Sequence, residues 1–256
     1  MPIVVKIGGS TLGEGDTTLE DLSALQEREE FPVVVHGGGK EIDRWLKRLG
    51  VSSSFVDGLR VTDEAVLEVV VAVLAGIVNQ SLVAQLNAKG GRAVGLTGID
   101  ACLMEAEVRR PELGQVGEIT KVNDGLLWLT LRRGYIPVIA PIGIDCARGT
   151  PLNINGDTAA GEIARAVEAQ RLIFLTDVPG IVDRGGEVIP ELTAPEARRL
   201  VESGVASGGM LPKIEACLRS GATCRIVDGR QPHALLREMA GDMAGTTVVG
   251  EGGEGD

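Results

Sequence analysis

The chain has 256 residues, with 36 Asp and Glu against 25 Lys and Arg, which gives a formal net charge of −11 at pH 7. An acidic chain repels the phosphate backbone of nucleic acids, and 2 Trp, 1 Tyr and 3 Phe residues are too few for a base-stacking surface, so we exclude nucleic acid as a partner. The 36 Gly residues are about twice the usual share of roughly 7% and follow no collagen-like period, which assigns them to turns and loops.

The first half of the chain predicts buried parallel strands that alternate with helices. Continuous β-branched runs indicate the strands, and apolar residues spaced by three or four indicate the helices. We expect strands at residues 2–7, 32–35, 93–96 and 136–140, and helices at 17–30, 40–49, 63–86 and 123–133. An extended hairpin is expected at 51–61, and a second hairpin, at 103–119, is expected on the edge of the sheet.

The second half repeats this alternation. Strands are expected at 172–175, 223–227 and 246–249, and helices at 156–166, 195–202, 209–220 and from 232. No disordered linker separates the halves, so the boundary falls near 141–151 and both halves share one sheet. We therefore predict an α/β fold, a three-layer αβα sandwich with a largely parallel central sheet and two lobes, 1–145 and 146–256.

The composition favours a cytoplasmic protein that is not in a membrane. No apolar run approaches the roughly 18 residues that a membrane-spanning helix needs, and the first residues lack a basic signal segment. The four cysteines lack the spacing of zinc ligands, so we expect reduced, mostly buried thiols and no metal site on the protein. They are Cys102, Cys146, Cys217 and Cys224.

Three predicted strands end in glycine-rich turns, at 8–9, 37–39 and 95–98. Because the carboxyl ends of parallel strands meet at one edge of a sheet, the bare N–H groups of these turns favour an anion site there. The residues around Gly37–Gly39 match neither a P-loop nor a dinucleotide-binding fingerprint, since the required glycine offsets are missing and Glu41 replaces the magnesium-binding hydroxyl.

Two lysines stand in unusual places. Lys6 interrupts an apolar strand, and Lys213 lies near the start of a predicted helix, where a cation opposes the helix dipole. Either lysine alone is more typical of a solvated side chain. Together with Asp157, at the start of another helix, they form a set suited to phosphoryl transfer.

Five motifs occur in the order and spacing of the amino acid kinase family: VKIGGS at 5–10, VHGGG at 35–39, GLRVT at 58–62, LNINGD at 152–157 and GMLPK at 209–213. The resemblance covers nearly the whole chain and is strongest to members that phosphorylate the side-chain carboxylate of N-acetyl-L-glutamate. It implies a carbamate kinase-like fold in which lobe 1–145 binds the amino-acid substrate and forms a homodimer. Lobe 146–256 would bind ATP, with Mg²⁺ held through the nucleotide phosphates.

The resemblance also implies roles for individual residues. Lys6 and Lys213 would neutralise the transferring phosphoryl group from opposite sides, and Asp157 would hold and orient both lysines. No general base is needed, because a carboxylate nucleophile is already ionised at pH 7.

Substrate contacts are implied in the N-terminal lobe and at its border. Arg60 would grip a substrate carboxylate, Asn153 would bind the backbone of the acetylated amino acid, and the amides of Gly38 and Gly39 would hold its reacting end. The alternatives are a surface hairpin arginine for Arg60 and a turn-forming residue for Asn153. The residues implied for the nucleotide are Gly8, Gly9, Asp177, Val178, Pro179, Gly180, Ile181, Val182, Val205, Ala206 and Ser207.

His36 is expected to pack behind a glycine turn without an acid–base role, and Lys40 to be solvated. The helix around 66–77 would form the dimer interface. Because the chain lacks the extra N-terminal helix of arginine-inhibited hexameric relatives, we expect no strong arginine feedback. Two alternatives stay open: a kinase of carrier-protein-linked aminoadipate or glutamate, and a non-catalytic nucleotide or amino-acid sensor.

Overall fold

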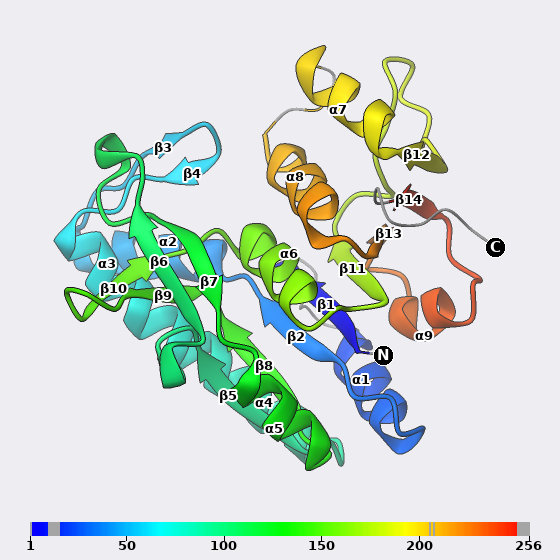
Figure 1. The fold of residues 1–256 in the computed structure, drawn as a ribbon, viewed down its shortest axis with the longest axis horizontal. Coiled ribbons are helices and arrows are strands. Elements are labelled where there is room, and N and C mark those ends of the chain that lie inside the picture. The colour runs from blue at the N-terminus through cyan, green and yellow to red at the C-terminus, as the bar shows by residue number, and fades with distance from the viewer. Residues whose placement is uncertain (1, 10–15, 205, 207, 250–256) are drawn as a thin grey trace.

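The computed structural model describes residues 2–9, 16–204, 206 and 208–249. Its main sheet has eight strands in the order β12-β14-β13-β11-β1-β2-β8-β5, and every pairing is parallel except that of β13 with β14. The strands are β1 Ile3–Ile7, β2 Val33–His36, β5 Ala93–Thr97, β8 Ile136–Ala140, β11 Arg171–Thr176, β12 Glu191–Thr193, β13 Thr223–Asp228 and β14 Gly245–Val249. Strand β1 lies between β2 and β11, so both halves of the chain contribute to one sheet, as predicted (Figure 1).

Helices cover both faces of this sheet, which confirms the three-layer sandwich. The helices are α1 Thr18–Glu27, α2 Gly39–Leu49, α3 Glu64–Val71, α4 Asn79–Ala88, α5 Gly125–Arg132, α6 Gly156–Ala166, α7 Ala194–Glu202, α8 Met210–Ser220 and α9 Ala234–Met239. One buried cluster joins the sheet to α5, α6 and α8 through Leu127, Ile163 and Ile214. A second cluster, on the other face, joins it to α1, α4 and α9.

The second predicted hairpin lies elsewhere than expected. Strands β6 Met104–Val108 and β7 Gly117–Val122 are antiparallel, but they belong to a separate four-stranded sheet in the order β10-β9-β6-β7. Its other strands, β9 Ile142–Asp145 and β10 Thr150–Asn153, occupy the stretch that we predicted to be the boundary between the lobes. Pro141 separates β8 from β9 and has no N–H to donate, which favours departure from the main sheet at this residue.

One long helical segment runs from α3 through the π-helix η1 Ala72–Val78 into α4. The expectation that no segment reaches membrane-spanning length was wrong, because Glu64–Ala88 is long and apolar enough to cross a membrane by length and composition. Core helices of water-soluble folds pass the same test. Here Val70, Leu74 and Leu82 are buried within the fold.

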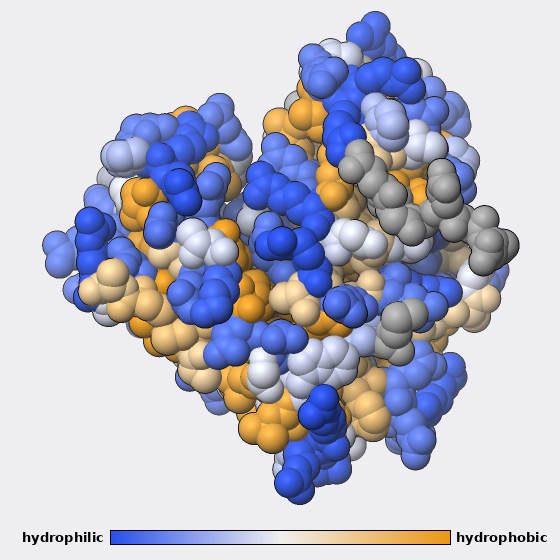
Figure 2. Space-filling model, viewed as in Figure 1, coloured by the Kyte–Doolittle hydropathy of each residue, from blue (hydrophilic) through white to orange (hydrophobic). Residues whose placement is uncertain are grey.

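The remaining elements are short. Strands β3 Phe55–Val56 and β4 Leu59–Arg60 form the first predicted hairpin, and the 3₁₀ turns η2 Asp100–Cys102 and η3 Pro111–Leu113 flank β6. In Figure 1 the hairpin lies at upper left, α7 and α8 lie at upper right, and α6 lies between them. The molecular surface is deeply notched between these two parts (Figure 2).

Candidate functional site

The site lies at the carboxyl edge of the main sheet, where β1 and β2 end and α6 and α8 begin. Lys6 is the penultimate residue of β1, and Asp157 and Lys213 lie in the first turns of α6 and α8. Asn155 caps α6, because its Oδ1 accepts hydrogen bonds from the N–H groups of Asp157 (2.9 Å) and Thr158 (3.0 Å). This cap fixes Asp157 where the helix dipole stabilises a carboxylate.

The two predicted lysines share the predicted aspartate. Lys6 Nζ lies 2.7 Å from Asp157 Oδ1, and Lys213 Nζ donates a hydrogen bond of 3.0 Å to Oδ2. Lys213 Nζ also donates to the carbonyl of Gly209 at 3.1 Å. The three side chains are only 8–14% exposed, so this is a buried cluster that joins the first strand of the chain to α8.

The charges of this cluster are unbalanced. Burial raises the pKa of Asp157, but the positive charges of Lys6 and Lys213 outweigh it and leave the pKa below its ordinary value. One carboxylate therefore faces two ammonium groups. The excess positive charge in a sparsely hydrated position is suited to binding a further anion.

Two glycine turns face each other beside Lys6. A Cβ atom built on Gly9 would lie 3.4 Å from the nitrogen of Gly38 and 3.8 Å from that of Gly39, and one on Gly37 would lie 3.9 Å from Lys6 Nζ. Gly38 also packs closely against η1, since a Cβ there would come within 2.5 Å of Leu74 Cδ2. The turns and the start of α2 thus bring backbone amides together next to a cation, as predicted.

His36 is fully buried behind these turns, and Lys40 is exposed, as we expected for both. Burial lowers the pKa of His36 to about 4, and the positive charge of Lys6 acts in the same direction. The imidazole is therefore neutral at pH 7, and its Nδ1 lies 2.8 Å from the carbonyl oxygen of Gly37.

Arg60 is not a surface hairpin arginine, because its side chain is buried. Its guanidinium pairs with Asp43 Oδ1 (2.7 Å), donates to Ser53 Oγ (2.9 Å) and stacks 4.6 Å above the ring centre of Phe55. At the end of β10, Asn153 donates from Nδ2 to Thr62 Oγ1 at 3.0 Å.

Most of the predicted catalytic and substrate residues line one cavity of about 190 Å³. Its polar lining comes from Lys6, Gly38, Gly39, Arg60, Asn153 and Asp157. Lys213 reaches this set through its bond to Asp157. Predicted residues from four separate stretches of the chain therefore line one cavity, and Lys213 contacts one of them.

The stretch predicted to bind nucleotide is placed apart from this cavity, after β11. Gly180 approaches β14 closely, since a Cβ there would lie 2.7 Å from Thr246 Oγ1, and Ile181 N–H donates to the same oxygen at 2.8 Å. None of the predicted nucleotide residues that the structure describes lines the 190 Å³ cavity. Ala206 is buried, whereas Val205 and Ser207 lie outside the described residues.

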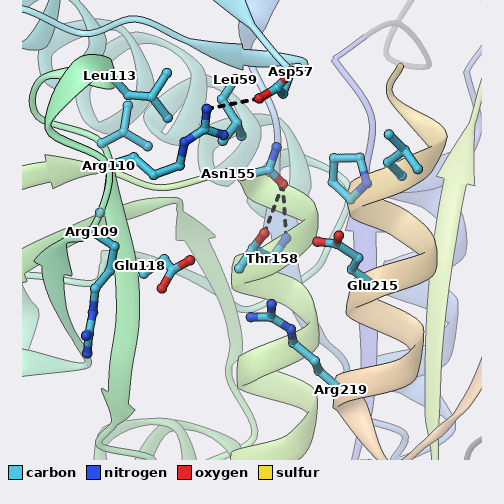
Figure 3. A pocket seen from close by; sticks show the side chains of 14 residues that line it. Asp57, Leu59, Arg109, Arg110, Leu113, Glu118, Asn155, Thr158, Glu215 and Arg219 are labelled. Atoms are coloured by element: carbon cyan, nitrogen blue, oxygen red, sulfur yellow. Dashed lines mark hydrogen bonds and ion pairs between the residues drawn. The ribbon is translucent and has the colours of Figure 1, made fainter. Parts of the chain in front are cut away.

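A second cavity, of about 220 Å³, adjoins the first and was not predicted. The two share Leu59, Val116 and Asn155. In Figure 3, Arg110 reaches across to Asp57, at 2.9 Å, while Glu215 and Arg219 project from α8 on the opposite side. The adjacent Arg109 and Arg110 could have indicated this cavity from the sequence, but we had assigned that stretch only to a hairpin on the edge of the sheet.

The donor atoms fit an anion better than a directly bound metal ion. Within the described residues there is no group of three His, Cys, Asp or Glu side chains that could hold a metal. Both oxygens of Asp157 face lysines.

The burial of the cysteines differs in part from our expectation. Cys217 and Cys224 are buried, but Cys102 is half-buried. Cys146 is exposed, because this residue follows β9 in a surface turn.

Comparisons with known proteins agree with this geometry. Residues 1–227 match the amino acid kinase family. An acetylglutamate kinase of Dehalococcoides mccartyi is 42% identical over 97% of this chain and 94% of its own length, and one of Parasynechococcus marenigrum is 47% identical over 98% and 89%. The crystal structure of smu.665 from Streptococcus mutans superposes with a TM-score of 0.84 at 27% identity, over 97% of this chain and 98% of that one. This chain belongs to the amino acid kinase family.

Proposed function

We propose that the chain is an ATP-dependent kinase that phosphorylates the side-chain carboxylate of N-acetyl-L-glutamate, giving N-acetyl-L-glutamyl 5-phosphate and ADP for arginine biosynthesis. The observation that carries the proposal is the buried Lys6–Asp157–Lys213 cluster beside two facing glycine turns. The names of the relatives, acetylglutamate kinases at 42% and 47% identity, support the choice of substrate.

In this reaction a carboxylate oxygen attacks the γ-phosphorus of ATP, and the bond from that phosphorus to the β–γ bridging oxygen breaks. The carboxylate is ionised at pH 7, so no side chain has to remove a proton. Lys6 and Lys213 neutralise the charge on the transferring group, and Asp157 keeps the two cations at their positions. The amides of Gly38 and Gly39 hold the reacting end of the substrate.

Arg60 binds the α-carboxylate of the substrate in this scheme. Its planar guanidinium is already oriented by Asp43, Ser53 and Phe55, so little side-chain entropy is lost on binding. Asn153 faces the same cavity and binds the backbone of the acetylated amino acid. Lobe 1–145 therefore supplies most of the substrate contacts.

Lobe 146–256 binds ATP in the proposal. The adenosine lies along residues 177–182 and 205–207, while Gly8 and Gly9 lie near the phosphates. Mg²⁺ would be held through the phosphate oxygens of ATP, in keeping with the anion-binding character of the site. Bound with ATP, the ion supplies additional charge neutralisation for the phosphoryl oxygens.

We also propose that the chain is a cytoplasmic homodimer. The π-helix η1 leaves the apolar residues Ala72, Gly76 and Ile77 exposed, which gives the dimer an interface of small and aliphatic residues. Sedimentation velocity at micromolar concentration should give a dimer. A hexamer would overturn this part of the proposal.

The function is tested by ADP release in a coupled assay. N-acetylglutamate, glutamate, aspartate, N-acetylaminoadipate and uridylate are offered side by side, with Lys213→Ala as the inactive control and Lys40→Ala, an exposed lysine outside the cluster, as the matched control. We expect the highest kcat/KM with N-acetylglutamate. Preference for N-acetylaminoadipate, or nucleotide binding without turnover on any acceptor, would instead support one of the two alternative functions.

A further inference from the structure

The mechanism above leaves one buried polar chain unexplained, behind the second glycine turn. Asn79, at the start of α4, is buried and donates from Nδ2 to the carbonyl of Val138 on β8 at 2.8 Å. The same Nδ2 lies 3.1 Å from His36 Nε2. On its other side the ring of His36 reaches Gly37, with Nδ1 at 2.8 Å from the carbonyl oxygen. The chain thus runs from the main sheet to the turn that lines the cavity.

The hydrogen atoms of this chain can be assigned from its acceptors. Val138 offers only a carbonyl oxygen, so Asn79 must turn its NH₂ group toward it, and the second amide hydrogen then points to His36 Nε2. Nε2 is therefore the acceptor, and the proton of the neutral ring is on Nδ1, from which it is donated to Gly37. Gly95 leaves room for the Asn79 side chain, because a Cβ atom at position 95 would lie 2.1 Å from Asn79 Oδ1 and would collide with it.

The bond to the Gly37 carbonyl fixes the direction of the next amide. In a trans peptide the C=O of Gly37 and the N–H of Gly38 point in opposite directions. When His36 holds the oxygen on the buried side, the N–H of Gly38 is directed away from the ring. Glycine backbones rotate freely, so without this bond the 37–38 peptide plane would have several accessible orientations.

We propose that His36, kept in its Nδ1–H form by Asn79, is a positioning residue that orients the Gly38 amide toward the reacting oxygen atoms. The inference rests on the proposed function and deepens it. His36 neither gains nor loses a proton in the reaction. It acts through Gly38, which lies against Gly9 in the cradle beside Lys6.

The tautomer can be measured without any assay of activity. The chain has 2 His residues, so ¹⁵N-histidine labelling gives few signals, and a His36→Asn variant identifies those of His36. We expect the shifts of a protonated Nδ1 and an unprotonated Nε2 at pH 7, unchanged down to about pH 5. A protonated Nε2, or an imidazolium at pH 7, would overturn the assignment.

Kinetics test the positioning role. In His36→Phe and Asn79→Leu, kcat per nucleotide-binding site should fall by about 10- to 100-fold, less than the 10²–10³-fold that complete removal of one such donor costs. KM for N-acetylglutamate should change by less than about threefold, because the amide is needed most in the transition state. Asparagine can place its NH₂ near the position of Nδ1, so His36→Asn should recover most of the loss.

The controls separate positioning from general loss of structure. Ser220→Ala removes another buried hydrogen bond, to the carbonyl of Cys217, and should lower the melting temperature without changing kcat. Counting sites by ADP titration corrects for unfolded protein. If the wild-type chain phosphorylates N-acetylglutamate and His36→Phe retains its kcat, only the positioning role is wrong. If the wild-type chain is inactive on N-acetylglutamate, the proposed function is wrong and the positioning role with it.

Discussion

Replacing Asp157 by Asn tests the physical basis of the site most directly. The substitution preserves size and removes one negative charge that contacts Lys6 at 2.7 Å and Lys213 at 3.0 Å. Two buried ammonium groups would then face each other across a neutral amide. The variant should be less stable than the wild-type chain, and its kcat should fall by at least about 100-fold, because the lysines no longer have a common anchor.

The size of the stability loss follows from the geometry. At an effective dielectric constant of about 20, opposite charges about 3 Å apart attract each other by about 5 to 6 kcal/mol. Desolvation offsets much of this attraction, and breaking a buried pair by removing one partner costs about 3 to 5 kcal/mol. For a chain of this length the melting temperature should fall by about 6 to 20 °C.

The loss of stability in Asp157→Asn should become smaller as the pH falls. Because the folded-state pKa of Asp157 lies below the ordinary value of about 3.9, its stabilising contribution is complete above that pH and disappears as the pH falls through the folded-state pKa. Urea unfolding of both proteins at pH 7, 5 and 3 measures the difference in free energy of unfolding. We expect an equal difference at pH 7 and 5 and a smaller one at pH 3. Equal stability of the two proteins at pH 7 would refute the reasoning.

Three further outcomes are expected. Arg60→Lys should raise KM for N-acetylglutamate about 10-fold with little change in kcat, because lysine has neither the planar pair of N–H donors nor the stacking on Phe55. A change confined to kcat would contradict this prediction. Gly38→Ala should lower kcat, and Leu74→Ala should partly restore it, because the new Cβ meets Leu74 at 2.5 Å; steady-state kinetics of the double variant decide. Since the pKa of His36 is lowered to about 4 from about 6.5, this residue alone should lower the free energy of unfolding by about 3 kcal/mol between pH 7 and 4. His36→Asn should remove that contribution and so reduce the pH dependence measured by urea unfolding.

The main sheet could be predicted because each of its strands can be recognised from its own short stretch of sequence. Runs such as 3–7 and 136–140 are buried on both faces and are therefore almost entirely apolar, with Lys6 as the exception. The second sheet could not be predicted in the same way. Strands β9 and β10 have four residues each, and β6 joins them through a parallel bridge between Glu105 and Ile144, far apart in the chain. A pairing between strands so far apart in the chain leaves no periodic pattern in the sequence of either strand.

The same distinction applies to the site. Lys6 and Lys213 were detectable because a charge in an apolar strand and a cation at a helix start each conflict with the local environment, whereas Asp157 was detectable through the LNINGD motif at 152–157. The residues that hold Arg60 and His36 in place do not stand out from their local sequence in this way. Asp43 is an ordinary acidic residue on a helix with a solvated face, and Asn79 is one of several polar residues in α4, so only the folded chain shows that they hold Arg60 and His36.

The net charge of −11 places a constraint on how such a chain binds two anionic substrates. Long-range attraction is unavailable, so the positive potential must be local and protected from solvent. The guanidinium of Arg60 is balanced by Asp43, and Lys6 and Lys213 are partly balanced by Asp157, so side-chain charges alone leave a small excess. The remaining attraction has to come from backbone dipoles at the glycine turns and at the start of α2, whose N–H groups carry partial positive charge without adding to the net charge. This explains why glycines, more than additional lysines, surround the cavity. A glycine turn lets a ligand approach the N–H groups closely, and their attraction is strongest at such short distances.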